Sequence, residues 1–115
     1  MESFAFVAPI LPGKEDACMR FAQEMAGPRR SEFEASRRRL GLTTQRLYLQ
    51  HTPQGALLIV YVEEDHLEQT SEGLATSQDP FDVWYRQQVQ DIHGLDLTQQ
   101  RSGPPSEQIF EWQAH

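Results

Sequence analysis

Residues 55–62 form an unbroken apolar run, Gly-Ala-Leu-Leu-Ile-Val-Tyr-Val, that follows a Thr-Pro-Gln-Gly turn at residues 52–55. A strand with one face in water alternates apolar and polar residues, so a run without alternation predicts a strand covered on both faces. A chain of 115 residues can cover one face of a sheet with its own helices and has little left for the other. The run therefore predicts a homodimer in which a second subunit packs on that other face.

The composition is typical of a soluble single-domain protein. The net charge of −7 argues against a nucleic-acid or anionic-membrane surface, since either needs a dominant positive field. Cys18 is the only cysteine, so no intramolecular disulfide can form. No stretch approaches the roughly twenty apolar residues that span a bilayer. We therefore expect one cytoplasmic domain over residues 1–115, with no nucleic-acid or membrane partner.

The first 41 residues predict one strand and two helices. Residues 4–10 predict the strand, and a Pro-Gly turn leads into an amphipathic helix over residues 14–26. A second helix is expected to begin at Ser31, because Glu34 three residues later completes a capping box. Gly41 suits the C-terminal cap of that helix.

A hairpin and two more helices are predicted to follow. Residues 46–51 alternate in polarity and predict a strand that the Thr-Pro-Gln-Gly turn joins to the apolar run. Asp65 is expected to cap a short helix that runs to about residue 76. Asp79, followed by Pro80, predicts the start of the strongest amphipathic helix, which Gly94 ends. Its apolar stripe consists of Phe81, Trp84, Tyr85, Val89 and Ile92.

The remaining residues predict a loop over 95–105 and a final strand over 107–112. The order of elements is then that of a ferredoxin-like, split β-α-β fold of the α+β class. Such a fold has a four-stranded antiparallel sheet with helices on one face. Two of these sheets packed face to face make a dimeric α+β barrel.

The chain resembles the dimeric α+β barrel superfamily, which includes the antibiotic-biosynthesis-monooxygenase-like proteins. The segment Asp-Pro-Phe-Asp-Val-Trp-Tyr-Arg at residues 79–86, continuing to Ile-His-Gly-Leu-Asp-Leu at residues 92–97, is similar to small bacterial families of this fold that have no assigned activity. The resemblance implies a homodimer with a cleft between sheet and helices. It implies a small aromatic or amphipathic molecule in that cleft.

The absence of asparagine narrows what the resemblance implies about chemistry. Cofactor-independent monooxygenases of the superfamily use Asn, Trp and Tyr around a polyaromatic substrate, and haem-degrading members use Asn, Trp and His. This chain contains no Asn, so neither pattern can be present intact, and haem degradation is disfavoured. We expect neither a cofactor nor a bound metal.

Three side chains are candidates for acid–base chemistry. His51 ends a strand and could act as a general base at the rim of a cleft, or simply lie half in water. Tyr48 could donate a hydrogen bond to a ligand if its face lines the barrel, or pack in the core if that face meets the helices. His93 precedes the Gly94 cap, where a His stabilises a helix C-terminus, although a site role stays open.

Four side chains are candidates for ligand binding. Arg46 shares a strand face with Tyr48 and could pair with an acidic group. Trp84 and Tyr85 are adjacent on a helix and diverge by about 100°, so one is expected to face the sheet and the other a flank or cleft. An aromatic stripe at helical spacing is more often core than a ligand shelf.

Three further clusters have simpler explanations. Residues 63–66, Glu-Glu-Asp-His, have metal-like composition, but contiguous residues at a strand end point in alternating directions and rarely converge on one ion. Arginines at 29–30 and 37–39 could hold an anionic ligand or an acidic partner, and solvated helix-end charges are the simpler interpretation. Cys18 lies on a buried stripe and is expected to be core.

Two functions stay open at this level. In one, the domain is an enzyme that oxygenates, isomerises or decarboxylates a small molecule in the barrel cleft. In the other, it is a non-catalytic dimeric scaffold that senses a ligand or engages a protein partner. A fold of this kind hosts unrelated functions and cannot decide between them.

Overall fold

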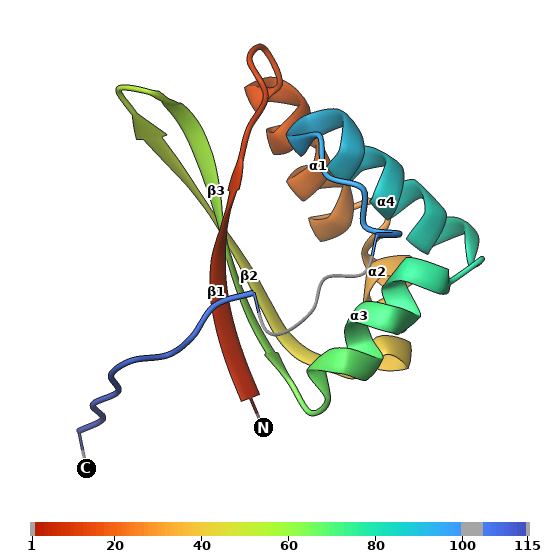
Figure 1. Cartoon of the computed structure of the whole chain (residues 1–115). Helices are drawn as coiled ribbons and strands as arrows, with labels where there is room; N and C mark the ends of the chain where they lie inside the picture. The colour runs from red at the N-terminus through yellow and green to blue at the C-terminus, as the bar shows by residue number, and fades with distance from the viewer. Residues whose placement is uncertain (1, 100–104, 115) are drawn as a thin grey trace.

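A three-stranded antiparallel sheet with four helices on one of its faces makes up the part of the chain that the computed structural model describes, residues 2–99 and 105–114 (Figure 1). The class is α+β, as predicted. The elements, in chain order, are β1 (Glu2–Pro9), α1 (Glu15–Ala26), α2 (Arg30–Leu40), β2 (Leu42–Thr52), β3 (Gly55–Glu64), α3 (Leu67–Thr76) and α4 (Pro80–His93).

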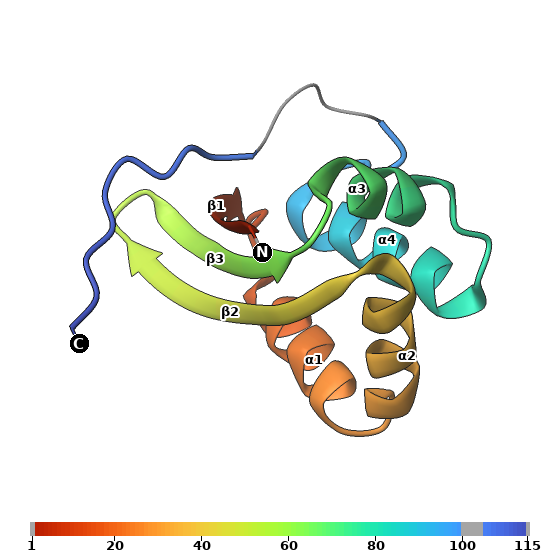
Figure 2. The same cartoon turned by 90° about the horizontal axis from the view of Figure 1, so that it is seen from below.

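β3, which contains the apolar run, is the central strand of the sheet. The strand order is β1-β3-β2, and both neighbours run antiparallel to β3. The predicted hairpin is confirmed: Thr52 lies opposite Gly55, whose φ of 125° suits a residue without a side chain. Figure 2 shows the sheet from its end, with the helices gathered on one side of it.

The two faces of the sheet have different surroundings. Along β3, Ala56, Leu58, Val60 and Val62 are buried against the helices, and the residues between them are only half-buried. Those intervening residues form what we call the open face, together with the residues that pair with them on β1 and β2. The open face consists of Ser3, Ala5, Val7, Pro9, Thr44, Arg46, Tyr48, Gln50, Leu57, Ile59, Tyr61 and Glu63.

The core lies between the helix-covered face and the apolar stripes of α1 and α4. Its buried residues include Cys18, Phe21 and Met25 of α1 and Phe81 and Ile92 of α4. The predicted ends of α4 are confirmed. The Asp79 carboxylate accepts a hydrogen bond from the backbone N–H of Phe81, and Gly94 is left-handed at φ 70°.

Two predicted helix starts are wrong. Ser31 does not cap α2, which begins at Arg30 and has no side-chain cap; Glu34 instead accepts a hydrogen bond from Arg30 at 2.8 Å. An ion pair across one turn has therefore replaced the capping box. Asp65 does not cap α3, because β3 continues to Glu64 and α3 begins only after His66.

The predicted fourth strand over residues 107–112 is also wrong. Residues 105–114 are extended but form no ladder, and the Ser106 hydroxyl accepts a hydrogen bond from the Ala5 backbone nitrogen at 3.2 Å. The carboxylates of Glu2, Glu107 and Glu111 line the groove between this segment and β1, so like charges oppose pairing. Of the predicted loop, residues 95–99 are irregular and residues 100–104 lie outside the described part of the chain.

Candidate functional site

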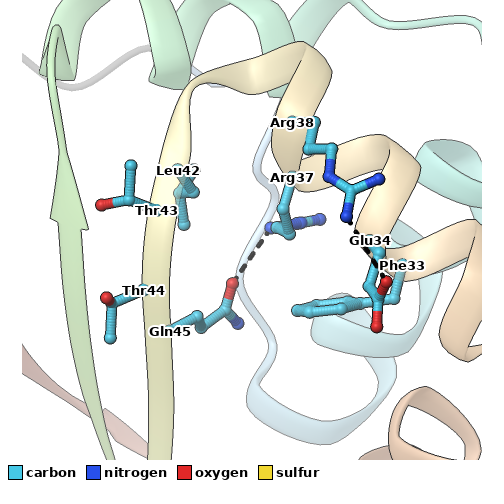
Figure 3. A pocket seen from close by; sticks show the side chains of 8 residues that line it. All are labelled: Phe33, Glu34, Arg37, Arg38, Leu42, Thr43, Thr44 and Gln45. Carbon is cyan, nitrogen blue, oxygen red and sulfur yellow. Dashed lines mark hydrogen bonds and ion pairs between the residues drawn. The ribbon is translucent and has the colours of Figure 1, made fainter.

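A cavity of about 220 Å³ opens between the second half of α2 and the first residues of β2 (Figure 3). Gly41, left-handed at φ 85°, turns the chain directly from the helix into the strand, so that the two elements form opposite walls. The cavity lies where the sheet meets the helices. We call it the Arg37 pocket, and it is lined by Phe33, Glu34, Arg37, Arg38, Leu42, Thr43, Thr44 and Gln45.

Arg37 is buried at the base of this pocket, with 7% of its surface exposed. Its guanidinium carbon lies 4.4 Å from the ring centroid of Tyr85 and 5.0 Å from that of Phe33. One terminal nitrogen donates to Gln45 Oε1 at 3.2 Å, and the other donates to Ser36 Oγ at 3.3 Å. Two aromatic rings and two hydrogen bonds therefore hold the guanidinium plane in a fixed orientation.

No carboxylate of the described residues forms an ion pair with Arg37. Among the described residues Arg37 forms no ion pair, and its Nε has no hydrogen-bond partner. Burying a charge without a counter-charge destabilises the folded state, and other interactions of the fold must offset this desolvation cost.

The nearest acidic groups are already engaged. Glu34 at the rim accepts from Arg30 and lies 3.8 Å from Arg38, and the hydrogen bond from Arg30 lowers its pKa. Asp82 reaches Arg37 only through the Ser36 hydroxyl, which accepts a hydrogen bond from Arg37 and donates one to Asp82 Oδ1. Arg39 pairs with Asp82 at 2.9 Å and supplies its counter-charge.

Gln45 connects Arg37 to Tyr85. Its amide nitrogen donates to the Tyr85 hydroxyl oxygen at 3.2 Å, while its amide oxygen accepts from Arg37. The two contacts fix which end of the amide faces the arginine. The Tyr85 hydroxyl accepts in this chain and so keeps its own proton available for donation.

The structure separates Tyr85 from Trp84, the other predicted aromatic ligand residue. Tyr85 lies against Arg37 and Gln45, next to the pocket. Trp84 packs between the rings of Phe21 and Phe81, each centroid 5.4 Å away, and the Arg29 guanidinium lies 4.3 Å above it. Trp84 therefore belongs to the core on the flank facing α1.

Arg46 and Tyr48 lie on the open face, with the sheet between them and the Arg37 pocket. Tyr48 has 54% of its surface exposed, so in the single chain it neither packs under the helices nor lines a cleft. The Arg46 guanidinium lies over the ring of Tyr61, 5.4 Å from its centroid.

The two candidate histidines lie apart from each other and from the pocket. His51 is exposed at the end of the hairpin, and its Nδ1 is 3.8 Å from Glu15 Oε2. His93 is buried, and its Nδ1 lies 2.8 Å from the carbonyl oxygen of Pro9. Since a carbonyl only accepts, Nδ1 carries the proton. His93 therefore ties the end of α4 to the end of β1.

The acidic residues at the end of β3 are divided between the two faces of the sheet. Glu63 accepts from the hydroxyls of Tyr61 and Thr44 on the open face, and Glu64 is buried under the helices. In the described part of the chain no three metal-ligating side chains converge. Cys18 is buried, and burial raises the pKa of its thiol.

Sequence reasoning did not single out Arg37 from the arginines at 37–39. The feature of the sequence that could have identified Arg37 is its spacing from Phe33, because residues four apart lie on the same helix face. An apolar residue at 33 therefore places residue 37 on the core side, whereas Arg38 points outward with 81% of its side chain exposed.

Comparison with protein-family models, with curated proteins and with solved structures found no match to this chain. The resemblance to the dimeric α+β barrel superfamily therefore stays a prediction. No helix in the described residues is long and apolar enough to cross a membrane.

Proposed function

We propose that the protein binds a small carboxylic acid with an aromatic or apolar body in the Arg37 pocket. The observation that supports this is a buried, ring-stacked guanidinium that faces a cavity and forms no ion pair with a carboxylate of residues 2–99 or 105–114. A carboxylate is the preferred partner because it is planar and can accept two parallel bonds from a guanidinium. It would also neutralise the buried charge of Arg37, for which the described residues supply no ion pair.

The walls of the pocket suit the rest of such a molecule. Phe33 and Leu42 offer apolar surface, and Gln45 offers a polar side chain on the opposite wall, whereas the Thr44 hydroxyl points away from the pocket to Glu63. The volume of about 220 Å³ is below the about 300–1,000 Å³ of typical sites for drug-sized ligands. The ligand is therefore small, on the scale of a single substituted ring.

The residues that line the pocket favour ligand binding without catalysis. Its lining contains no His, Cys or Asp, and its one carboxylate, Glu34, is held by two arginines. General acid–base catalysis needs a group that can take and return a proton near neutral pH. A reaction on the bound molecule stays a prediction from the resemblance alone.

We further propose that the protein acts as a homodimer through the open face. Val7 and Tyr48 are each 54% exposed there, and Ile59 lies between them in the register. Exposed apolar surface on a sheet is typical of a protein interface. Sedimentation velocity at micromolar concentration should show a species of twice the 13.2 kDa chain mass, and a monomer at every concentration would contradict the dimer.

Thermal unfolding with benzoate tests the ligand proposal. A ligand that binds only the folded state stabilises it by mass action, so millimolar benzoate should raise the melting temperature. Benzyl alcohol has the same ring without the charge and should have no effect. Inorganic phosphate in a parallel titration tests whether the site takes any small anion.

Matched variants locate the effect. Arg37→Gln should abolish the stabilisation by benzoate, and Arg38→Gln should keep it, because Arg38 lies at the rim with most of its side chain in water. Both variants are first checked for a cooperative transition without ligand. An equal benzoate response in the two variants would overturn the proposal.

A further inference from the structure

The C-terminal arm, residues 105–114, carries large apolar side chains that the chain itself leaves in water. Ile109 is 90% exposed, Phe110 is 69% exposed and Trp112 is 76% exposed. In Figures 1 and 2 the arm leaves the fold beside β1 and projects on the side of the sheet away from the helices. Three such residues within four positions are a concentrated apolar surface with no cover in the single chain.

The arm begins in contact with its own sheet. The Ala5 backbone nitrogen donates to Ser106 Oγ, so this N–H points away from β3. Alternate residues of an antiparallel strand point their backbone groups the same way, so Ser3 and Val7 also present theirs at this edge. The edge of β1 is thus open to a further strand, and the arm starts where that strand would lie.

Electrostatic repulsion opposes pairing of the arm with the edge of β1 beyond Ser106. Past Ser106 the arm brings Glu107 and Glu111 toward Glu2, and these three carboxylates line one groove without a basic residue among its lining. Like charges facing each other across strands are destabilising. This repulsion therefore keeps the arm from pairing with β1 of its own chain, and the apolar residues of the arm stay uncovered there.

We propose that the C-terminal arm of one copy packs on the β2 margin of the open face of a second copy, and that the second arm does the same in return. Tyr48 offers exposed aromatic surface there for Phe110 and Trp112. Arg46 is the one basic residue on the open face and can pair with Glu107 or Glu111 of the other copy. The carboxylates that repel the arm from β1 of its own chain therefore attract it to Arg46 of the second copy.

The arm is long enough for this exchange. At about 3.3 Å per extended residue, residues 106–112 span on the order of 20 Å. Two sheets packed face to face lie about 10 Å apart. The arm can therefore cross the interface and still lay its apolar residues on the partner. The inference rests on the homodimer proposed above.

The test follows Trp112 in a Trp84→Phe variant, where Trp112 is the only tryptophan left. Its emission and its quenching by acrylamide are recorded alongside sedimentation, from high concentration down to dissociation. We expect Trp112 to be shielded in the dimer and to become exposed as the dimer dissociates. In the native background, a chain ending at Ser106 should dimerise at least tenfold more weakly.

The outcomes separate the two proposals. A dimer whose Trp112 is quenched at every concentration, and whose affinity the truncation leaves unchanged, would overturn the arm exchange and keep the homodimer. A monomer at all concentrations with Trp112 exposed would overturn the homodimer and the exchange together. A monomer with Trp112 shielded would place the arm on its own chain and overturn the exchange.

Discussion

The Ser36 hydroxyl of α2 donates a hydrogen bond to Asp82 Oδ1 of α4 across 46 positions of sequence, and both side chains are fully buried. Asp82 also accepts from Ser77 and from Arg39, at 2.9 Å for the arginine. One carboxylate thus ties together α2, α4 and the linker before α4. Because Ser36 also accepts from Arg37, this carboxylate fixes the back of the Arg37 pocket.

Replacing Asp82 by Asn should lower the free energy of unfolding by about 3 kcal/mol, since the charge that Arg39 and two hydroxyls hold is lost. Burial alone would raise the pKa of Asp82, but the bonds from Ser36, Ser77 and Arg39 outweigh it and lower that pKa. The stabilisation is therefore present above the unfolded value of about 3.9 and is lost as pH falls through the lower folded value.

Urea unfolding of the Asp82→Asn variant between pH 7 and pH 2 measures both effects. Asp91→Asn is the control on the same helix, because Asp91 forms an exposed pair with Lys14 and its loss should cost less than about 1 kcal/mol. Equal losses in the two variants would contradict a special role for Asp82.

Replacing Glu64 by Gln should stabilise the protein at neutral pH by about 1 kcal/mol. Glu64 is almost fully buried, its Oε1 has no partner among the described residues, and burial raises the pKa of its carboxyl. Wild-type stability is therefore highest below the unfolded pKa of about 4.3 and declines as pH rises through the higher folded value. The variant should lack this decline in chemical unfolding experiments across that pH range.

Glu63→Gln is the matched control for that experiment. Glu63 lies on the open face, and the hydrogen bond from Tyr61 lowers the pKa of its carboxyl. Its neutral replacement should not stabilise the protein at neutral pH. Stabilisation by both replacements would point to relief of the net charge of −7 and would refute the burial argument.

Adjacent residues of β3 should give opposite results when replaced by Asp. Leu58 is buried under the helices, so Leu58→Asp should prevent folding. Ile59 lies on the open face, so Ile59→Asp should leave a folded chain that sediments as a monomer. Circular dichroism with sedimentation velocity makes the comparison, and a folded Ile59→Asp dimer would exclude the open face as the interface.

Trp84→Ala should lower the free energy of unfolding by about 3–5 kcal/mol, because the indole packs between Phe21 and Phe81 in the core. The response to benzoate should persist at temperatures where the variant is folded, since Trp84 does not line the Arg37 pocket. Wild-type stability in calorimetry would show that the indole contributes little to the core.

The sequence predicted most elements because local signals agreed with tertiary packing. The Thr-Pro-Gln-Gly turn, the Asp79 cap and the Gly41 and Gly94 ends all act over a few residues and are confirmed. The prediction of the final strand was wrong because carboxylates from opposite ends of the chain, Glu2 and Glu107, oppose its pairing with β1. These two residues become neighbours only in the fold.

The candidate site was less predictable for the same reason. Arg37, Gln45 and Tyr85 come from three elements, and nothing local indicates that a glutamine of β2 bridges an arginine and a tyrosine. Tyr85 was singled out as an aromatic on a helix, and its partners were not. The alternation of residues 46–51 correctly assigned Arg46 and Tyr48 to one strand face, but it could not tell whether that face meets the helices or lies open.

The most direct test of the central claim is the nuclear magnetic resonance signal of the Arg37 Nε–H. This group is buried and unpartnered among the described residues, so its proton should exchange slowly enough to be observed. Its assignment comes from its absence in Arg37→Lys. Titration with benzoate should shift this signal together with the amide signals of residues 42–45, and benzyl alcohol should leave them in place. An Arg37 signal that does not move at saturating benzoate would contradict the proposed carboxylate site.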